Sequence, residues 1–341
     1  MPTGIEWTDE TWNPVTGCAK VSQGCKHCYA EREWPRMVKL VPSYAGRAFT
    51  DVACHEDRLD QPLRWKRPRK VFVNSMSDLF HPDVPDGFID RVFAVMALAP
   101  HHVFQVLTKR PARMQEYLNR PAVEVRIGLE AMSMCMDFAV ATKGKSKLGA
   151  GVMLKGSDIN PGGLATWPLP NVWLGVSVED QAAADERIPL LLETPTAVRW
   201  ISAEPLLGPI DLESVLWPNK GGHRVDVLRA GYWNAAGYRY GGPSAELGAE
   251  RCLFTNHSDM ASIDWVVAGG ESGPNARPMV LGWAKDIVSQ CQAAGVPVLV
   301  KQLGANPTNR EGEPHQISDR KGAIMSEWPE ELRIREYPNA A

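Results

Sequence analysis

Three cysteines lie close together in one stretch of the chain, Gly17-Cys18-Ala19-Lys20-Val21-Ser22-Gln23-Gly24-Cys25-Lys26-His27-Cys28-Tyr29. Their spacing is C-x6-C-x2-C, and a glycine directly precedes both Cys18 and Cys25, which allows a tightly folded loop. An odd number of clustered thiols argues against a closed set of disulfides, and a four-cysteine zinc site needs a further sulfur. Three thiolates on one short loop are what a [4Fe–4S] cluster needs if one of its irons stays open to a ligand.

This cysteine loop, residues 17–29, stands at the start of a repeating pattern of strands and helices. Residues 5–15 contain the first expected strand, and a helix is expected to begin near Tyr29. The apolar pattern predicts further strands at 71–74, 103–107, 171–176, 198–201, 263–267 and 296–300, and helices at 87–99, 111–119, 180–193 and 281–294, with a weak helix near 210–216. Short strands that mostly alternate with helices are typical of a parallel sheet.

Polar or charged residues follow each expected strand, and in barrel and doubly wound folds the carboxyl ends of the strands are where sites are built. We therefore predict an α/β fold of the partial (β/α)6-type, TIM-like barrel class with two insertions. The barrel is expected over residues 1–310, with insertions at about 121–170 and 218–262, and residues 311–341 form a C-terminal tail. A flat doubly wound sheet is the alternative, although no G-x-G-x-x-G follows the first strand.

Composition limits the class of protein further. The 341 residues carry a net charge of −3, which excludes a globally basic nucleic-acid binder but leaves room for a local patch. Seven cysteines in a chain of this length fit free or metal-bound thiols in a reducing compartment. We see no signal peptide and no apolar run of membrane-spanning length, so we expect a cytoplasmic protein without a membrane partner.

The motifs around the loop resemble a known superfamily. The loop is followed by Tyr29-Ala30 and preceded by Glu6-Trp7-Thr8-x-x-Thr11-Trp12-Asn13-Pro14, and polar strand ends recur at 74–78, 107–110, 174–177, 202–205 and 269–271. These features resemble the radical S-adenosylmethionine (SAM) superfamily and, more narrowly, a phage and prophage family of three-cysteine-motif, radical-SAM-like proteins. The superfamily's usual spacing is C-x3-C-x2-C with an aromatic residue before the last cysteine; here the first gap is six, and His27 takes the aromatic's place.

The resemblance implies two cofactors and a reaction type. Cys18, Cys25 and Cys28 hold a [4Fe–4S] cluster, whose open iron is chelated by SAM. One electron, from a donor such as flavodoxin or ferredoxin, then generates a 5′-deoxyadenosyl radical that abstracts hydrogen from the substrate. The phage-type resemblance implies a nucleic-acid or modified-nucleotide substrate in the host cytoplasm, in one form as an isomerase of amino-acid-modified thymine in hypermodified phage DNA, with a partner protein as a further possibility.

The resemblance also suggests which strand-end residues bind SAM. The segment Asn74–Asp78, with Asn74, Ser75, Ser77 and Asp78 as the polar members, takes the place of the motif that binds the SAM amino group; as an alternative, these residues cap a helix. Glutamates suit the ribose or amine, lysines suit a carboxylate or a substrate anion, and glycine permits close approach. The remaining candidates are Lys109, Glu179, Glu204, Gly270, Glu271 and Lys301, each of which is otherwise a solvated charge or a turn residue.

Two other functions remain open on the sequence. One is a DNA repair lyase of the photoproduct type, which is also a radical-SAM activity. The other is a zinc-stabilised nucleic-acid- or partner-binding protein without catalysis, with His27 or His55 as the fourth ligand. The basic run Arg64–Lys70, which contains Trp65, suits a phosphate backbone or a solvated edge. The other cysteines, Cys54, Cys135, Cys252 and Cys291, are expected to pack or to be exposed by chance.

Overall fold

The computed structural model describes residues 3–141, 164, 166–217, 223–232, 255–256 and 260–338. Most of the two expected insertions, together with Cys252, lies outside these residues. The chain divides into two compact units. Unit 1 comprises residues 1–21, 28–174 and 194–197, and unit 2 comprises residues 22–27, 175–193 and 198–341.

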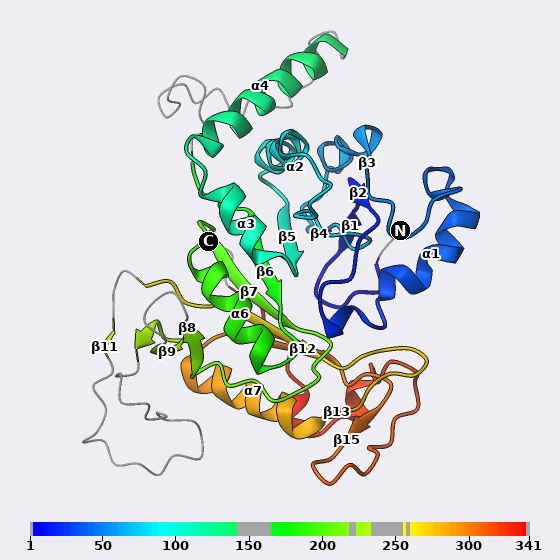
Figure 1. Ribbon diagram of the computed structural model, residues 1–341, viewed down its shortest axis with the longest axis vertical. Coiled ribbons are helices and arrows are strands. Elements are labelled where there is room, and N and C mark those ends of the chain that lie inside the picture. Colours follow the sequence, from blue (N-terminus) through cyan, green and yellow to red (C-terminus); the bar gives the residue numbers. More distant parts are fainter. Residues whose placement is uncertain are drawn as a thin grey trace. The chain divides into compact units, whose positions relative to one another are not determined.

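Unit 1 contains the first strand–helix repeats of the chain. Its strands are β1 (Glu10–Trp12), β2 (Val15–Thr16), β3 (Ala53–Cys54), β4 (Lys70–Val73) and β5 (Val103–Thr108), and its helices are α1 (Tyr29–Leu40), α2 (Asp86–Leu98), α3 (Pro111–Leu118) and α4 (Val123–Ala141). These elements run from blue to turquoise in Figure 1. β1 pairs with β4 and β4 with β5, both in parallel, whereas β2 and β3 form a separate antiparallel pair.

Unit 2 continues the same alternation. It holds α6 (Gln181–Leu192), β7 (Val198–Ala203), β12 (Trp265–Gly269), α7 (Leu281–Ala294) and β14 (Val298–Gln302), while β6 (Val172–Ser177) passes from unit 1 into unit 2. β12 pairs in parallel with both β7 and β14. Smaller strands complete the unit: β8 (Val215–Trp217), β9 (His223–Asp226), β10 (Gly231–Tyr232), β11 (Thr255–Asn256), β13 (Met279–Val280) and β15 (Pro307–Thr308).

The strand order identifies the way in which the sheet is wound. Hydrogen bonding gives the seven-stranded sheet the order β1-β4-β5-β6-β7-β12-β14, so each strand neighbours the next sheet strand along the chain. A doubly wound sheet reverses its order at a switch point, whereas a (β/α) barrel does not. The fold is therefore mixed α/β with a sequentially ordered sheet of seven strands, compatible with a barrel-like fold.

Aromatic side chains fill much of the space on the strands of unit 2. Trp200 of β7 is in register with Trp265 of β12, and their fully buried rings lie 5.4 Å apart between centroids. The backbone of Gly175 in β6 lies so near Trp200 that a Cβ there would meet the indole at 2.4 Å. A tryptophan of this volume therefore requires glycine on the adjacent strand.

Two segments differ from what the sequence pattern suggests. The weak helix expected near 210–216 is wrong: this segment contains turns and then β8, which pairs with β9. The first insertion begins with the long helix α4, which was not expected. Residues 311–338, which belong to the expected C-terminal tail, pack against the rest of unit 2: Trp328 and Leu332 are buried, and Val300 donates to the carbonyl of Ile334.

The structure also bears on membrane association. Among the residues that it describes, no helix combines the length and the apolar character needed to cross a bilayer.

The glycine–tryptophan contact gives a test of the packing. Gly175→Ala should destabilise the protein by about 1–3 kcal/mol, because the added methyl group overpacks a filled core. The control is Gly87→Ala in the first turn of α2, where a Cβ meets nothing within 4 Å and alanine should stabilise by up to about 1 kcal/mol. Urea denaturation midpoints measure both changes. Equal midpoints for the two variants would contradict this account of the core.

Candidate functional site

The cysteine loop begins at a position that only glycine can occupy without strain. Gly17 has φ +91°, and a Cβ there would lie 2.4 Å from the carbonyl oxygen of Asp51. Just before it, β2 pairs with β3, so the chain enters the loop in a fixed direction. The backbone N–H of Cys18 then donates to the carbonyl of Phe49 at 2.8 Å, which fixes the position of the first cysteine in unit 1.

The polar end of β4 is bonded along the entrance to this loop. The backbone N–H of Val15 donates to Asn74 Oδ1 at 3.1 Å, and that of Gly17 donates to the carbonyl of Met76 at 3.1 Å. Ser77 Oγ donates to the carbonyl of Val15 at 2.8 Å. Ser75 Oγ similarly donates to the Asn13 side chain. The serines predicted to meet SAM are thus hydrogen-bonded to the chain leading into the loop.

One of the two polar side-chain atoms of Asn74 makes no hydrogen bond within the described residues. The residue is buried, with 3% of its surface exposed, and has a left-handed backbone with φ +62°. Its Oδ1 accepts from Val15, but its Nδ2 has no hydrogen-bond partner among the described residues. An unmet buried donor is costly. Because the atom is a donor, it suits an acceptor such as a carboxylate better than the ammonium group expected for this segment.

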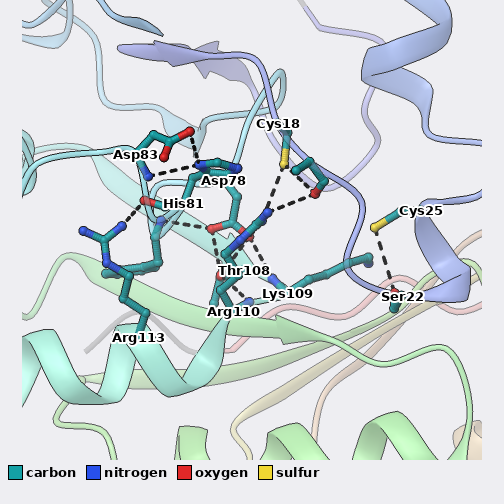
Figure 2. Close-up of polar contacts among 12 residues, drawn as sticks. Cys18, Ser22, Cys25, Asp78, His81, Asp83, Thr108, Lys109, Arg110 and Arg113 are labelled. Atoms are coloured by element: carbon teal, nitrogen blue, oxygen red, sulfur yellow. Dashed lines mark hydrogen bonds and ion pairs between the residues drawn. The ribbon is translucent and has the colours of Figure 1, made fainter. Parts of the chain in front are cut away.

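Asp78 is the centre of a buried polar network at the ends of β4 and β5. Its carboxylate accepts from Thr108 Oγ1 at 2.8 Å and from the backbone N–H groups of Phe80 and Lys109 at 3.0 and 3.1 Å. Arg110 Nη1 lies 3.2 Å from Asp78 Oδ2 and 3.5 Å from Cys18 Sγ. Figure 2 shows the Arg110 guanidinium reaching from the carboxylate to the sulfur.

Arg110 also holds the backbone of the loop. Its Nη2 donates to the carbonyl of Ala19 at 2.9 Å, so one guanidinium contacts the first cysteine of the loop, the residue after it and the carboxylate of Asp78. Burial and the nearby Asp78 raise the pKa of Cys18 to about 11, against the opposing effect of Arg110. The thiol alone is therefore protonated at neutral pH, and a metal that binds it must displace that proton.

An apolar cluster shields two of the three sulfurs. Ala30, Trp34, Tyr44, Phe49 and Met76 form this buried cluster, and both Cys18 and Cys28 pack against it. The hydrophobic surroundings of a metal site limit solvent access and set its dielectric. The two cysteines of unit 1 thus lie in an environment that suits a solvent-sensitive centre.

The tip of the loop, residues 22–27 with Cys25, belongs to unit 2 and is held there by carboxylates. Ser22 Oγ donates to Glu179 Oε1 at 2.8 Å, and Arg187 Nη1 donates to Glu179 Oε2 at 2.9 Å. Glu179 and Arg187 are both almost fully buried, and breaking such a pair would leave a buried charge without compensation, so the two stay paired. A Cβ on Gly24 would collide with Glu179, so glycine is needed at this contact.

Glu271 holds the other side of the tip. It accepts from His27 Nδ1 at 3.0 Å and from Arg277 Nη2 at 2.6 Å, while Arg277 Nη1 donates to the carbonyl of Gln23 at 2.9 Å. Burial alone would raise the pKa of Glu271, but the bonds from Arg277 and His27 outweigh it and hold the pKa at about 2. Glu271 therefore stays charged at any pH near neutrality.

The other predicted strand-end residues of unit 2 pair with one another. Lys301 Nζ lies 3.1 Å from Glu204 Oε1, and Ser202 Oγ donates to Glu204 Oε2 at 3.3 Å. A Cβ on Gly270 would lie 2.2 Å from the carbonyl oxygen of Leu303, so the close approach that this glycine permits is to the neighbouring strand end. Lys109 lies in unit 1, where its backbone N–H bonds Asp78.

The residue types of the loop, though not their arrangement in the structure, agree with the metal chemistry that the sequence suggests. No group of three or more histidine, cysteine or acidic side chains is arranged around a common metal position within the described part of the chain. The six cysteines in that part are free thiols. Three free thiols on one loop, two of them against an apolar cluster, match the soft ligands of an iron–sulfur cluster, and the spare donor of Asn74 matches a carboxylate ligand.

The histidines of the zinc alternative are engaged in other contacts. His55 is buried in unit 1, and its Nε2 lies 2.7 Å from Thr16 Oγ1. Burial, Arg58 and Arg47 lower the pKa of His55 to about 4, so the ring is neutral at pH 7. His27 donates to Glu271 in unit 2.

The basic run before β4 lies at the amino end of that strand, whereas the cysteine loop follows the carboxyl end of β1. Within the run, Arg69 pairs with Glu10 and lies over the Trp65 ring, which also packs against His102. Trp65 is therefore occupied by packing. Lys66 and Arg67 are exposed and can still meet a phosphate backbone.

Three arginines of the site were not among the residues singled out from the sequence: Arg110, Arg187 and Arg277. Arg110 follows directly after Thr108-Lys109 at the end of β5, so its position gave a signal, but the pattern does not distinguish it from Lys109. Arg187 and Arg277 carry no such signal, because each is defined by a carboxylate that only the folded chain brings near.

The fold and the loop together define an α/β protein with a three-cysteine loop beside the polar strand ends. Over residues 2–329 the chain matches a family model described as "Protein of unknown function (DUF5131)", and it therefore belongs to this family. No curated protein and no solved structure matches it.

Glu271→Gln should release the loop tip. The uncharged amide no longer pairs with Arg277, so trypsin should cut after the exposed Lys26 several times faster than in the wild type. The rates are read by mass spectrometry on metal-free protein, in which no cluster can hold the loop. The control is Glu204→Gln, whose carboxylate pairs with Lys301. Equal cleavage in the two variants would disprove the anchoring role.

The acid sensitivity of the protein should depend on His55. The folded-state pKa of about 4 lies below the ordinary value of 6.5, so the unfolded chain binds more protons between these values, and stability falls as the pH is lowered from 6.5 to 4. His55→Gln cannot titrate and should lose less stability across this window in urea titrations. His101→Gln, at an exposed position, should follow the wild type. An unchanged slope in His55→Gln would refute the prediction.

Proposed function

We propose that this chain is a radical-SAM enzyme whose [4Fe–4S] cluster is held by Cys18, Cys25 and Cys28. We further propose that it acts on a nucleic-acid or modified-nucleotide substrate, as an isomerase of amino-acid-decorated thymine. The first part is supported by the loop and by the residues bonded to it in unit 1, whereas the second rests on the resemblance of the motifs.

The supporting observation is the bonding of the β4 end along the entrance to the cysteine loop. Asn74, Met76 and Ser77 all contact the chain between Val15 and Gly17. In this arrangement the strand end expected to bind SAM lies beside the first cysteine ligand. The buried Nδ2 of Asn74 supplies a donor that no residue in the described part of the chain uses.

When bound, the cluster and SAM supply one-electron chemistry that yields a radical able to remove hydrogen from a substrate. The protein's own residues bind and protect these cofactors. Cys18, Cys25 and Cys28 would provide thiolates, and the apolar cluster around Trp34 and Phe49 limits the access of water to Cys18 and Cys28. Asn74 would donate to the carboxylate of SAM.

The zinc-stabilised binding protein is the competing function, and metal identity separates the two. Anaerobically purified protein should be brown and, after reduction with dithionite, should give a four-iron electron paramagnetic resonance signal that changes when SAM is added. Each of Cys18→Ala, Cys25→Ala and Cys28→Ala should lose most of this signal, because a ligand is missing. Cys54→Ala, in which the altered cysteine lies outside the loop, is the matched control and should keep it.

Two results would overturn the proposal. Colourless protein with about one zinc per chain would assign it to the binding class. A cluster signal that SAM leaves unaltered would exclude SAM as its ligand. For the substrate, release of 5′-deoxyadenosine with DNA that carries amino-acid-decorated thymine, but not with irradiated DNA, is expected; the reverse pattern would indicate the photoproduct lyase.

A further inference from the structure

Arg110 and Asp78 form a nearly buried ion pair beside the first cysteine of the loop. Their side chains are 11% and 7% exposed, and all of the residues concerned lie in unit 1. Asp78 lies in the loop after β4 and Arg110 lies at the N-cap of α3, two residues after β5, and hydrogen bonds from Thr108 and two backbone N–H groups hold the carboxylate in place. Because these two charges are shielded from water, their electrostatic effect on nearby groups is stronger than that of exposed charges.

Arg110 is directed at the sulfur by three contacts. Asp78 Oδ2 accepts one of its bonds, the carbonyl of Ala19 accepts a second, and Nη1 lies 3.5 Å from Cys18 Sγ, within the reach of a hydrogen bond to sulfur. Asp78 is itself held by Thr108 and by backbone N–H groups. The guanidinium therefore has little freedom to turn away from Cys18.

We propose that Arg110 and Asp78 are positioning residues that fix Cys18 as a cluster ligand and set the reduction potential of the cluster through opposite charges. This rests on the proposed function, because it needs the cluster. Reduction adds one electron and breaks no bond, so the redox centre gains one negative charge. A donor and positive charge at the ligating sulfur stabilise the reduced form, and a nearby carboxylate destabilises it.

The two residues should therefore shift the potential in opposite directions. Arg110→Gln removes the donor charge and leaves Asp78 unpaired beside the sulfur, so the reduced cluster becomes harder to form. Asp78→Asn retains an oxygen that can accept from Thr108 and Lys109 but removes the negative charge, so the reduced cluster becomes easier to form. Damage to folding alone has no reason to produce opposite signs.

The experiment is a redox titration of the reconstituted holoprotein, followed by electron paramagnetic resonance, with dithionite as the reductant. At a fixed potential, the ratio of reduced to oxidised cluster should fall about ten-fold in Arg110→Gln, which corresponds to about 59 mV for one electron, and should rise in Asp78→Asn. Arg110→Lys keeps the charge without the planar fork and should lie between Arg110→Gln and the wild type. If Arg110→Gln holds no iron, the reduction potentials of Arg110→Lys and Asp78→Asn are compared with the wild type instead.

The matched control is Arg113→Gln. Arg113 lies in the first turn of α3, the helix that Arg110 caps, but it contacts the carbonyls of His81 and Val84 and the carboxylate of Asp86 and not a sulfur, as Figure 2 shows in part. This variant should keep the wild-type potential even if its melting temperature falls. Potentials that stay the same in Arg110→Lys and Asp78→Asn, or that move in the same direction in Arg110→Gln and Asp78→Asn, would overturn the inference. Wild-type protein without iron would instead refute the proposed function.

Discussion

The buried carboxylate of Asp78 is the constraint from which the arrangement of unit 1 follows. It lies in the loop that follows β4 and accepts from Thr108 and from the backbone of Lys109 at the end of β5, so it links the segments that follow two neighbouring strands. A buried charge must be paired. Arg110 meets that need and, from the same position, reaches Cys18. The requirement to neutralise one carboxylate thus places a cation at the sulfur of the first cysteine.

In unit 2 the tip of the loop is also held by buried carboxylates that need a paired cation. Glu179 and Glu271 are each paired with an arginine and each bonded to a residue of the tip, Ser22 and His27. Acidic residues after parallel strands suggest ligand binding, but here these two hold the loop that carries Cys25. Positioning of the loop is thus by itself a sufficient reason for Glu179 and Glu271 to be acidic.

The sequence predicted the elements whose pattern is local and missed those that depend on distant partners. Helices α1, α3 and α7 and the sheet strands follow from apolar spacing and from Pro111 at a helix start. The helix predicted near 210–216 was wrong because the apolar residues of this segment, Leu212 and Val215, are buried in turns and in a strand that pairs with β9. Similarly, the position of a residue at a strand end was predictable, but its partner was not: nothing near Glu271 in the pattern indicates that His27 donates to it.

Polarity at a strand end is therefore weaker evidence for a ligand than an unmet polar atom is. Ser75, Ser77, Asp78 and Glu204 all stand where a cofactor was expected, yet each has a hydrogen-bond partner within the protein. Asn74 differs because its oxygen accepts from Val15, whereas its buried nitrogen has no hydrogen-bond partner among the residues that the structure describes. An acceptor that reaches this nitrogen would remove the cost of leaving it unpaired. A donor at this point calls for a hydrogen-bond acceptor, of which a carboxylate is one kind, and that is a more specific requirement than the strand-end position alone could give.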